Sequence, residues 1–274
     1  MTHPMPSTEN SRATVEPDLA LPQTGAPQSK HIPWNPWVAV AFVVVVYFLS
    51  QVIAAIALSL YTSAQHWTTA QSNDWLSSSI YAQFFYTLIA EGLVIVAMYQ
   101  FLRLYKRGWK AIGFRKPKWS DLGMGLLLAP LYYISYLVIV TVAGLLVPSL
   151  NVDQQQQLGF NPIGTWQLAL TFISLVLLPP LVEETLMRGY LYTSLKKGLP
   201  QLAAALVTSV IFASAHLQAG SGAPLLWVAA IDTFVLSLFL IWLREKTGSL
   251  WASITLHALK NSVAFLSLFI FHLT

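Results

Sequence analysis

Leu181-Val182-Glu183-Glu184-Thr185-Leu186-Met187-Arg188 places two carboxylates and a guanidinium inside one of the most apolar parts of the chain. The twenty residues before Glu183, 163–182, carry no charge at all. A charged residue at the centre of a membrane helix costs about 2.5–3.5 kcal/mol on translocon-based scales. Three charges within six positions therefore need partners or a function.

The spacing of these charges separates a pair from a single carboxylate. Glu184 and Arg188 are four residues apart, so on a helix they share one face and are expected to form an ion pair. Glu183 points about 100° away and has no basic residue three or four positions later. We therefore expect Glu183 to be the free, addressable carboxylate. The alternative is a helix end at the cytoplasmic surface with ordinary solvated charges.

The composition of the whole chain is that of a membrane protein. Of 274 residues, 55% are hydrophobic and 9% are charged, whereas soluble domains are about 25% charged. The sequence predicts an all-α fold, a polytopic transmembrane bundle of about 7–8 helices in contact with the lipid bilayer. No nucleic-acid partner is expected. Because there is no cysteine, disulfides, thiolate metal sites and cysteine nucleophiles are excluded.

The chain divides into a polar tail and a membrane domain. Residues 1–35 are rich in proline and show no apolar period, which predicts a disordered tail. Residues 36–274 form the predicted transmembrane helical domain. Its seven apolar segments are each about 17 residues or longer, enough for a span; they cover residues 37–61, 78–102, 121–147, 164–195, 200–217, 224–243 and 249–271. Pro179 and Pro180 interrupt the fourth segment, so a kink or a re-entrant end is expected there.

Basic residues are distributed unevenly among the loops. They gather at Arg103, Lys106, Arg107, Lys110, Arg115, Lys116, Lys118, Arg188, Lys196, Lys197, Arg244 and Lys246. The alternate loops 62–77, 148–163 and 218–223 contain no lysine or arginine. This asymmetry predicts a multi-pass protein of the cell membrane with the N-terminus in the cytoplasm. With seven spans, the C-terminus lies outside.

His216 is a candidate partner of Glu183. It follows Phe212 by four residues on the same helix face, and it is as far from the turn near Pro200 as Glu183 is. If the fourth and fifth segments form an antiparallel hairpin about that turn, Glu183 and His216 reach the same depth. The alternative for His216 is a hydrogen bond to a neighbouring helix.

His257 and Asn261 also share one helix face, four residues apart. Their imidazole and amide are both able to donate hydrogen bonds. The alternative is a contact that joins two helices. Glu91 and Asp232 lie inside other apolar segments and have no partner at helical spacing. Each is either a buried functional acid or part of a pair in the packed bundle, and we assign them no role from the sequence.

Three motifs in order carry a family resemblance. Glu183-Glu184-x-x-x-Arg188, Phe212-x-x-x-His216 and His257-x-x-x-Asn261 resemble those of the CPBP family of intramembrane proteases, the CAAX protease and bacteriocin-processing group, also called Abi. The likeness covers residues of about 165–265, the CPBP-like core. The first three apolar segments and the tail carry no motif of the family.

The resemblance implies an intramembrane endopeptidase. By this likeness Glu183 is the general base that activates water, His216 positions that water, and His257 and Asn261 form the oxyanion hole. Glu184 and Arg188 are then supporting residues. The substrate would be a membrane-associated or lipophilic peptide or protein, with no cofactor and no metal. Eukaryotic relatives cut after a prenylated cysteine, and that specificity is not carried over.

Three other interpretations remain. A zinc-dependent protease could use the same glutamate and histidines as ligands, although no His-Glu-x-x-His helix is present. A non-catalytic bacteriocin-immunity or membrane scaffold protein could bind a peptide with the same polar cluster. A secondary transporter would suit the intramembrane acids and the proline-interrupted helix, although no internal repeat is evident. We rank the glutamate mechanism first.

Overall fold

The structure of the chain is a computed structural model that describes residues 1, 3, 32–153, 160–218 and 224–272. The chain divides into two units, Met1–His31 and Ile32–Thr274. Nearly all of the first unit, and with it most of the predicted tail 1–35, lies outside the described residues. Trp34 belongs to the second unit. It is 1% exposed and donates its indole N–H to Ser194 Oγ at 2.7 Å, so it is part of the core.

The described part of the second unit is helical and contains no strand, which confirms the predicted all-α class. The α-helices are α1 (Pro36–Ala64), α2 (Thr69–Ser78), α3 (Ile80–Leu104), α4 (Trp119–Leu146), α5 (Thr165–Phe172), α6 (Leu178–Glu184), α7 (Thr193–Leu195), α8 (Gln201–Ser214), α9 (Trp227–Thr247) and α10 (Trp251–Phe265). A 3-10 turn covers Trp109–Ile112, and π-helical turns cover Ile173–Leu177, Thr185–Tyr192 and Leu266–Ile270.

Six helices in the described residues are long and apolar enough to cross a membrane. One of them is continuous over Thr165–Leu195 and joins α5, α6 and α7 through two π turns; we call it the central helix. Six of the seven predicted segments therefore form helices long enough for a span. The fifth segment, 200–217, was expected to be long enough as well but contains the 14-residue α8. At 1.5 Å per residue α8 is about 21 Å long, short of the roughly 30 Å apolar core of a bilayer.

Local sequence accounts for the helix ends. α1 starts at Asn35-Pro36, where the Asn35 side chain accepts the Trp37 N–H at 2.8 Å and proline takes the first helical position. The polar helix α2 was not predicted, because it lies in a region without apolar periodicity. It begins with a reciprocal capping box between Thr68 and Gln71. α9 ends at Gly248, whose φ of 66° suits a residue without a Cβ.

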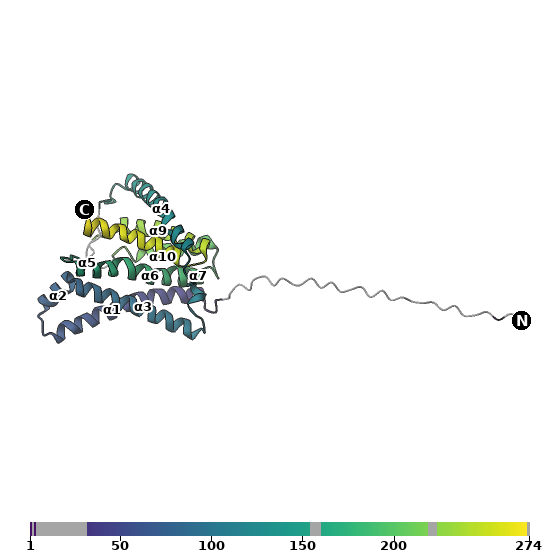
Figure 1. Ribbon diagram of the computed structural model, residues 1–274, viewed down its shortest axis with the longest axis horizontal. Helices are drawn as coiled ribbons and strands as arrows, with labels where there is room; N and C mark the ends of the chain where they lie inside the picture. Colours follow the sequence, from purple (N-terminus) through teal and green to yellow (C-terminus); the bar gives the residue numbers. More distant parts are fainter. Residues whose placement is uncertain (2, 4–31, 154–159, 219–223, 273–274) are drawn as a thin grey trace. The chain divides into compact units, whose positions relative to one another are not determined.

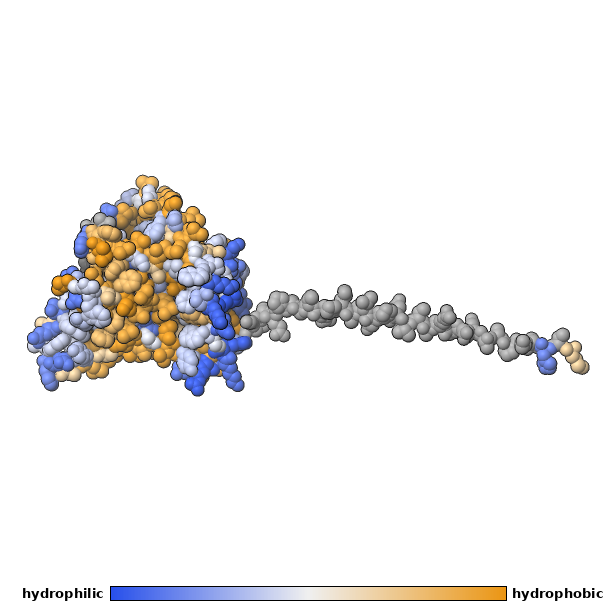
Figure 2. Space-filling view, viewed as in Figure 1, coloured by the Kyte–Doolittle hydropathy of each residue, from blue (hydrophilic) through white to orange (hydrophobic). Residues whose placement is uncertain are grey.

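The central helix lies between two groups of helices (Figure 1). α1 and α3 contact it on one side, and α9 and α10 contact it on the other. α8 packs against α9 and against the second π turn of the central helix, and α4 covers α9 and α10. In the space-filling view an apolar band occupies the middle of the bundle, with hydrophilic residues at both ends (Figure 2). This is the pattern expected of a protein that spans a bilayer.

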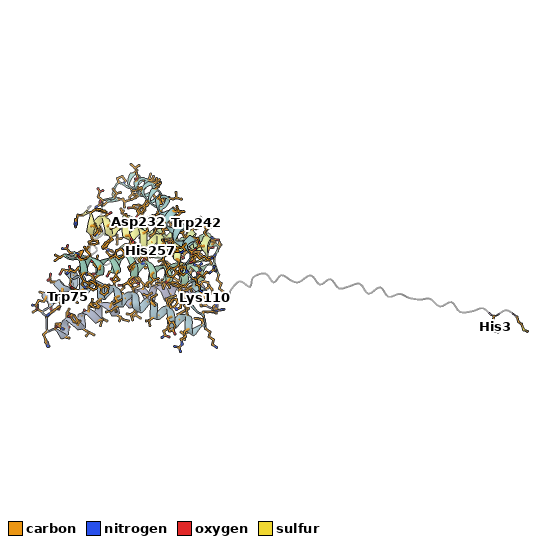
Figure 3. The ribbon with its side chains drawn as sticks, viewed as in Figure 1. His3, Trp75, Lys110, Asp232, Trp242 and His257 are labelled. Atoms are coloured by element: carbon orange, nitrogen blue, oxygen red, sulfur yellow. The ribbon has the colours of Figure 1, made fainter. Side chains whose placement is uncertain are left out.

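The basic loops meet at one end of the bundle. Lys196 Nζ lies 2.7 Å from Glu245 Oε2, Arg244 donates to the Ile112 carbonyl at 3.4 Å, and the Trp251 indole donates to the Arg115 carbonyl at 2.7 Å. Figure 3 shows Lys110 at this end and Trp75 at the opposite end, with His257 between them. The polar motif residues are therefore held within the apolar part of the bundle.

Candidate active site

The central helix passes through Pro179 and Pro180 without ending. Proline has no N–H to donate to the carbonyl four residues earlier, and the backbone accommodates this with a π turn in which the Leu178 N–H bonds to the Ile173 carbonyl. Of the two expected alternatives, a kink or a re-entrant end, the re-entrant end is not observed, because the helix continues to Leu195. π turns of this kind often occur at functional sites, and here they flank α6, which carries Glu183 and Glu184.

Asn261 on α10 supplies a hydrogen bond to a backbone carbonyl in this part of the central helix. Its side-chain amide donates to the carbonyl oxygen of Leu175 at 2.8 Å. Leu175 is the residue four positions before Pro179, so its carbonyl is the one that the proline leaves without an α-helical donor. One amide hydrogen of Asn261 is thus used in structure, and the second remains for another acceptor.

Glu184 and Arg188 form the ion pair that their spacing predicts. Arg188 Nη1 lies 2.9 Å from Glu184 Oε1, and both side chains are fully buried. The guanidinium also stacks over the ring of Phe212, 4.4 Å from its centroid. His257 Nδ1 lies 3.0 Å from the same Glu184 oxygen. The buried pair therefore contacts the His257 ring through Nδ1.

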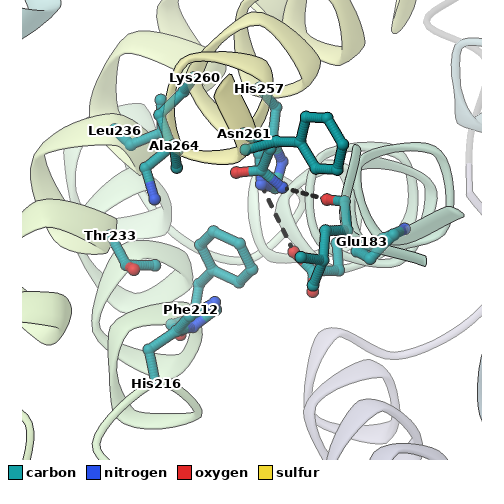
Figure 4. Close-up of a pocket in the computed structure, with 12 residues that line it drawn as sticks. Glu183, Phe212, His216, Thr233, Leu236, His257, Lys260, Asn261 and Ala264 are labelled. Atoms are coloured by element: carbon teal, nitrogen blue, oxygen red, sulfur yellow. Dashed lines mark hydrogen bonds and ion pairs between the residues drawn. The ribbon is translucent and has the colours of Figure 1, made fainter. Parts of the chain in front are cut away.

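Glu183 is the accessible carboxylate of the two. Its side chain is 26% exposed, whereas that of Glu184 is fully buried. His257 Nε2 lies 3.7 Å from Glu183 Oε2, which is longer than a hydrogen bond. Figure 4 shows Glu183 and His257 side by side at a pocket, joined by the dashed line of this contact. Glu183 thus keeps its lone pairs available for a water molecule.

That pocket has a volume of about 180 Å³, and it brings the predicted site residues together. Glu183, His216, His257 and Asn261 all line it, as the hairpin argument predicted for the first two. We call it the α10 pocket. His216 Nδ1 lies 2.9 Å from the Phe212 carbonyl oxygen. Because a carbonyl only accepts, Nδ1 carries the proton and Nε2 is left as an acceptor.

The hydrogen bonds already made limit which groups can stabilise an oxyanion. Glu184 as a carboxylate only accepts, so the Nδ1 of His257 must donate to it. Nε2 of His257 then carries a second proton only when the ring is cationic. Asn261 keeps one free amide hydrogen. Of Asn261 and His257, only Asn261 therefore has a free donor whether or not the His257 ring is cationic.

Two charged residues near the site were not predicted to take part in it. Lys260 lines the α10 pocket, and its Nζ lies 3.1 Å from Asp232 Oδ2. Asp232 in turn accepts a hydrogen bond from the Tyr132 hydroxyl. A lysine within an apolar span, one turn after His257, was the sequence signal for this pair. The pairing of Lys260 with Asp232 could not be predicted from spacing, because Asp232 lies on another helix, α9.

Glu91 lies on a second pocket that shares Glu183, Phe212 and His216 with the first. In the described part of the chain no three His, Cys, Asp or Glu side chains are grouped closely enough to hold a metal ion. The ligand set that the zinc alternative needs, Glu183 with His216 and His257, is therefore not converged. These residues line a pocket without meeting at one point.

Part of the chain matches the model of a known protein family. Residues 165–263 match the family model described as type II CAAX prenyl endopeptidase Rce1-like. The match covers the central helix from its first residue and ends two residues after Asn261. Comparisons with curated proteins and with solved structures found no match.

Proposed function

We propose that this multi-pass membrane protein cleaves a membrane-associated peptide or protein with Glu183 as the general base. Its residues 165–263 match the Rce1-like family of type II CAAX prenyl endopeptidases, which indicates a protease. The observation that carries the proposal is the partly exposed Glu183 carboxylate, which faces the α10 pocket together with His216, His257 and Asn261. Substrate and catalytic roles are proposed here from that arrangement.

The reaction begins with a water molecule between Glu183 and His216. The Glu183 carboxylate takes one proton from this water, and His216 Nε2 accepts a hydrogen bond from the other hydrogen. The water oxygen then bonds to the carbonyl carbon of the scissile peptide. Positioned proton transfer of this kind contributes about 10²–10⁴ in rate.

The negative charge that develops on the carbonyl oxygen needs a donor. Asn261 supplies its free amide hydrogen, and His257 joins it through Nε2 when its ring carries two protons. One such donor is worth about 2.7–4 kcal/mol in a site that excludes water. When the tetrahedral intermediate collapses, the C–N bond breaks and Glu183 returns its proton to the leaving nitrogen. The products are a carboxylic acid and an amine, which ionise to a carboxylate and an ammonium group, and no cofactor is consumed.

Glu184 and Arg188 act as support rather than as reactants in this proposal. Their buried pair holds His257 by its Nδ1, and both side chains are inaccessible to a substrate. We further propose that the end of the bundle that carries Lys110 faces the cytoplasm of the cell. The basic loops that meet there support this orientation.

The test is peptide cleavage by the purified protein in lipid, with products identified by mass spectrometry from a mixed peptide library. Wild type and Glu183→Gln are compared, each with and without a zinc chelator. We expect wild-type cleavage that survives the chelator and is lost in the variant. Loss with chelator and recovery with zinc would instead establish the metalloprotease. No cleavage by the wild type of any peptide, lipidated peptides included, would favour a binding or immunity role.

A further inference from the structure

Glu91 is a carboxylate in the middle of the membrane-spanning helix α3. Across the described residues it makes no hydrogen bond and no ion pair. An isolated charge at this depth costs about 2.5–3.5 kcal/mol. In contrast, the other acid that the sequence left unassigned, Asp232, is explained by its pairing with Lys260. Glu91 therefore needs a different explanation.

The side chain of Glu91 faces a pocket of about 280 Å³, which we call the α1–α3 pocket. Polar side chains from three elements line it, namely Tyr47 and Gln51 of α1, Glu91 of α3, and Gln218 after α8. A water molecule occupies roughly 30 Å³ in the liquid, and cavities with several polar groups hold water while apolar ones stay dry. The α1–α3 pocket has both the room and the polar groups for several waters.

The α1–α3 pocket and the α10 pocket meet at three residues. Glu183, Phe212 and His216 line both of them. The α10 pocket alone carries Asn261, beside which the proposed function places the scissile carbonyl. The lining of the α1–α3 pocket does not include Asn261. Water in this pocket would therefore reach Glu183 and His216 away from the proposed position of the scissile carbonyl.

We propose that the α1–α3 pocket is an internal water store that supplies the hydrolytic water to Glu183, and that Gln51 and Glu91 are positioning residues that hold this water. Each turnover consumes one water molecule within an apolar part of the protein, so a supply separate from the peptide is useful. The supply role rests on the proposed function, whereas the presence of water in the pocket does not.

The first test measures water in the pocket and needs no substrate. The chain has no cysteine, so Gln51→Cys and Val52→Cys each place a single thiol. Gln51 lines the pocket, while its neighbour Val52 is 53% exposed on the apolar outside of α1. The variants are reconstituted in phosphatidylcholine–phosphatidylglycerol vesicles and treated with 2-aminoethyl methanethiosulfonate. This reagent reacts with the thiolate, a form that requires water.

We expect Gln51→Cys to react at least about tenfold faster than Val52→Cys, because a thiol in lipid stays protonated and unreactive. Equal and slow reaction of both would show that the pocket is dry and would overturn the inference. Equal and fast reaction would show that the whole face of α1 is wetted, and this would overturn it as well. Either result leaves the proposed proteolytic function standing.

The second test separates water supply from substrate binding. Glu91→Leu removes a polar group from the pocket, and Glu91→Gln retains one. Thr87→Val changes polarity one turn earlier on α3, where the hydroxyl bonds, among the residues that the structure describes, only to the Gln83 carbonyl. We expect Glu91→Leu to lower kcat about tenfold or more with KM unchanged, and Glu91→Gln and Thr87→Val to stay near wild type. A rise in KM alone, or an equal loss in Thr87→Val, would contradict the positioning role.

Discussion

Asn261 on α10 donates its side-chain amide to the carbonyl oxygen of Leu175 on the central helix at 2.8 Å. This carbonyl is the one that Pro179 leaves without an α-helical donor. The residue that we propose as the oxyanion donor is therefore also the residue that supports the proline-containing turn ahead of Glu183. The Asn261 amide thus has a structural bond and a proposed catalytic role. Substitutions that restore the structural bond in another way can test the two roles separately.

Replacing Asn261 with leucine should reduce both stability and activity. The Leu175 carbonyl is left without a partner, which costs about 1–3 kcal/mol when such a group is buried. In the Pro179→Ala background the new N–H of residue 179 can serve that carbonyl, so the stability loss should largely disappear. Activity should remain low in both backgrounds, because the oxyanion donor is missing in each. Thermal unfolding and cleavage rate measure the two effects.

A matched control is Ser262→Ala on the next position of α10, where the hydroxyl bonds only within its own helix. It should leave both quantities near wild type. If Pro179→Ala with Asn261→Leu recovered activity together with stability, Asn261 would be a structural residue only.

The sequence predicted which residues line the α10 pocket better than it predicted the contacts among them. Glu183, His216, His257 and Asn261 could be found because polar residues are rare in apolar segments, and because His257 and Asn261 are spaced four apart. The bond from Asn261 to Leu175 could not be found, because it joins helices 86 residues apart in the chain. The same holds for Lys260 with Asp232, since their pairing depends on how α9 and α10 pack.

The fold shows a similar division. The all-α class and the membrane spans follow from composition and segment length, which depend on local sequence alone. The predicted length of the fifth segment was wrong, because the apolar run 200–217 continues past Ser214, where α8 ends. The chain leaves the helical conformation after Ser214, and Gln218 has a positive φ of 52°. Hydropathy records apolar residues and does not record where a helix stops.

Breaking the buried ion pair should be costly. Arg188→Met leaves Glu184 as a buried carboxylate without its cation, and removing one partner of such a pair costs about 3–5 kcal/mol. The double variant Arg188→Met, Glu184→Gln should be less destabilised than Arg188→Met, because no uncompensated charge remains. Arg103→Met, which removes an exposed arginine at the end of α3, serves as the control. Equal stability of Arg188→Met and Arg103→Met in a thermal unfolding assay would refute this assignment.

Lys260 and Asp232 should behave as a second pair. Both side chains are only partly buried, at 26% and 15% exposure, so we expect Lys260→Met to cost about 1–3 kcal/mol. Adding Asp232→Leu should recover most of that loss. Lys246→Met at the exposed basic end is the matched control. A double variant that is less stable than either single variant would show that the two residues act separately.

The orientation in the membrane can be tested with single cysteines in the cysteine-free chain. Asp74→Cys lies at the α2 end and Lys110→Cys at the basic end, and both positions are exposed. With the basic end in the cytoplasm, an impermeant maleimide added to intact cells should label Asp74→Cys, and should label Lys110→Cys only after permeabilisation. The reverse pattern would invert the proposed topology.

In the proposed mechanism Glu183 activates the hydrolytic water without a metal. The most direct test of this activation is the kcat of Glu183→Gln in the presence of a zinc chelator, measured on the best peptide that the wild type cleaves. Glutamine keeps the size and most of the polarity of the side chain but cannot take a proton. We predict a fall in kcat of about 10²–10⁴ with an unchanged thermal unfolding midpoint, while wild type under chelator stays fully active. A folded Glu183→Gln variant with wild-type kcat would contradict the account.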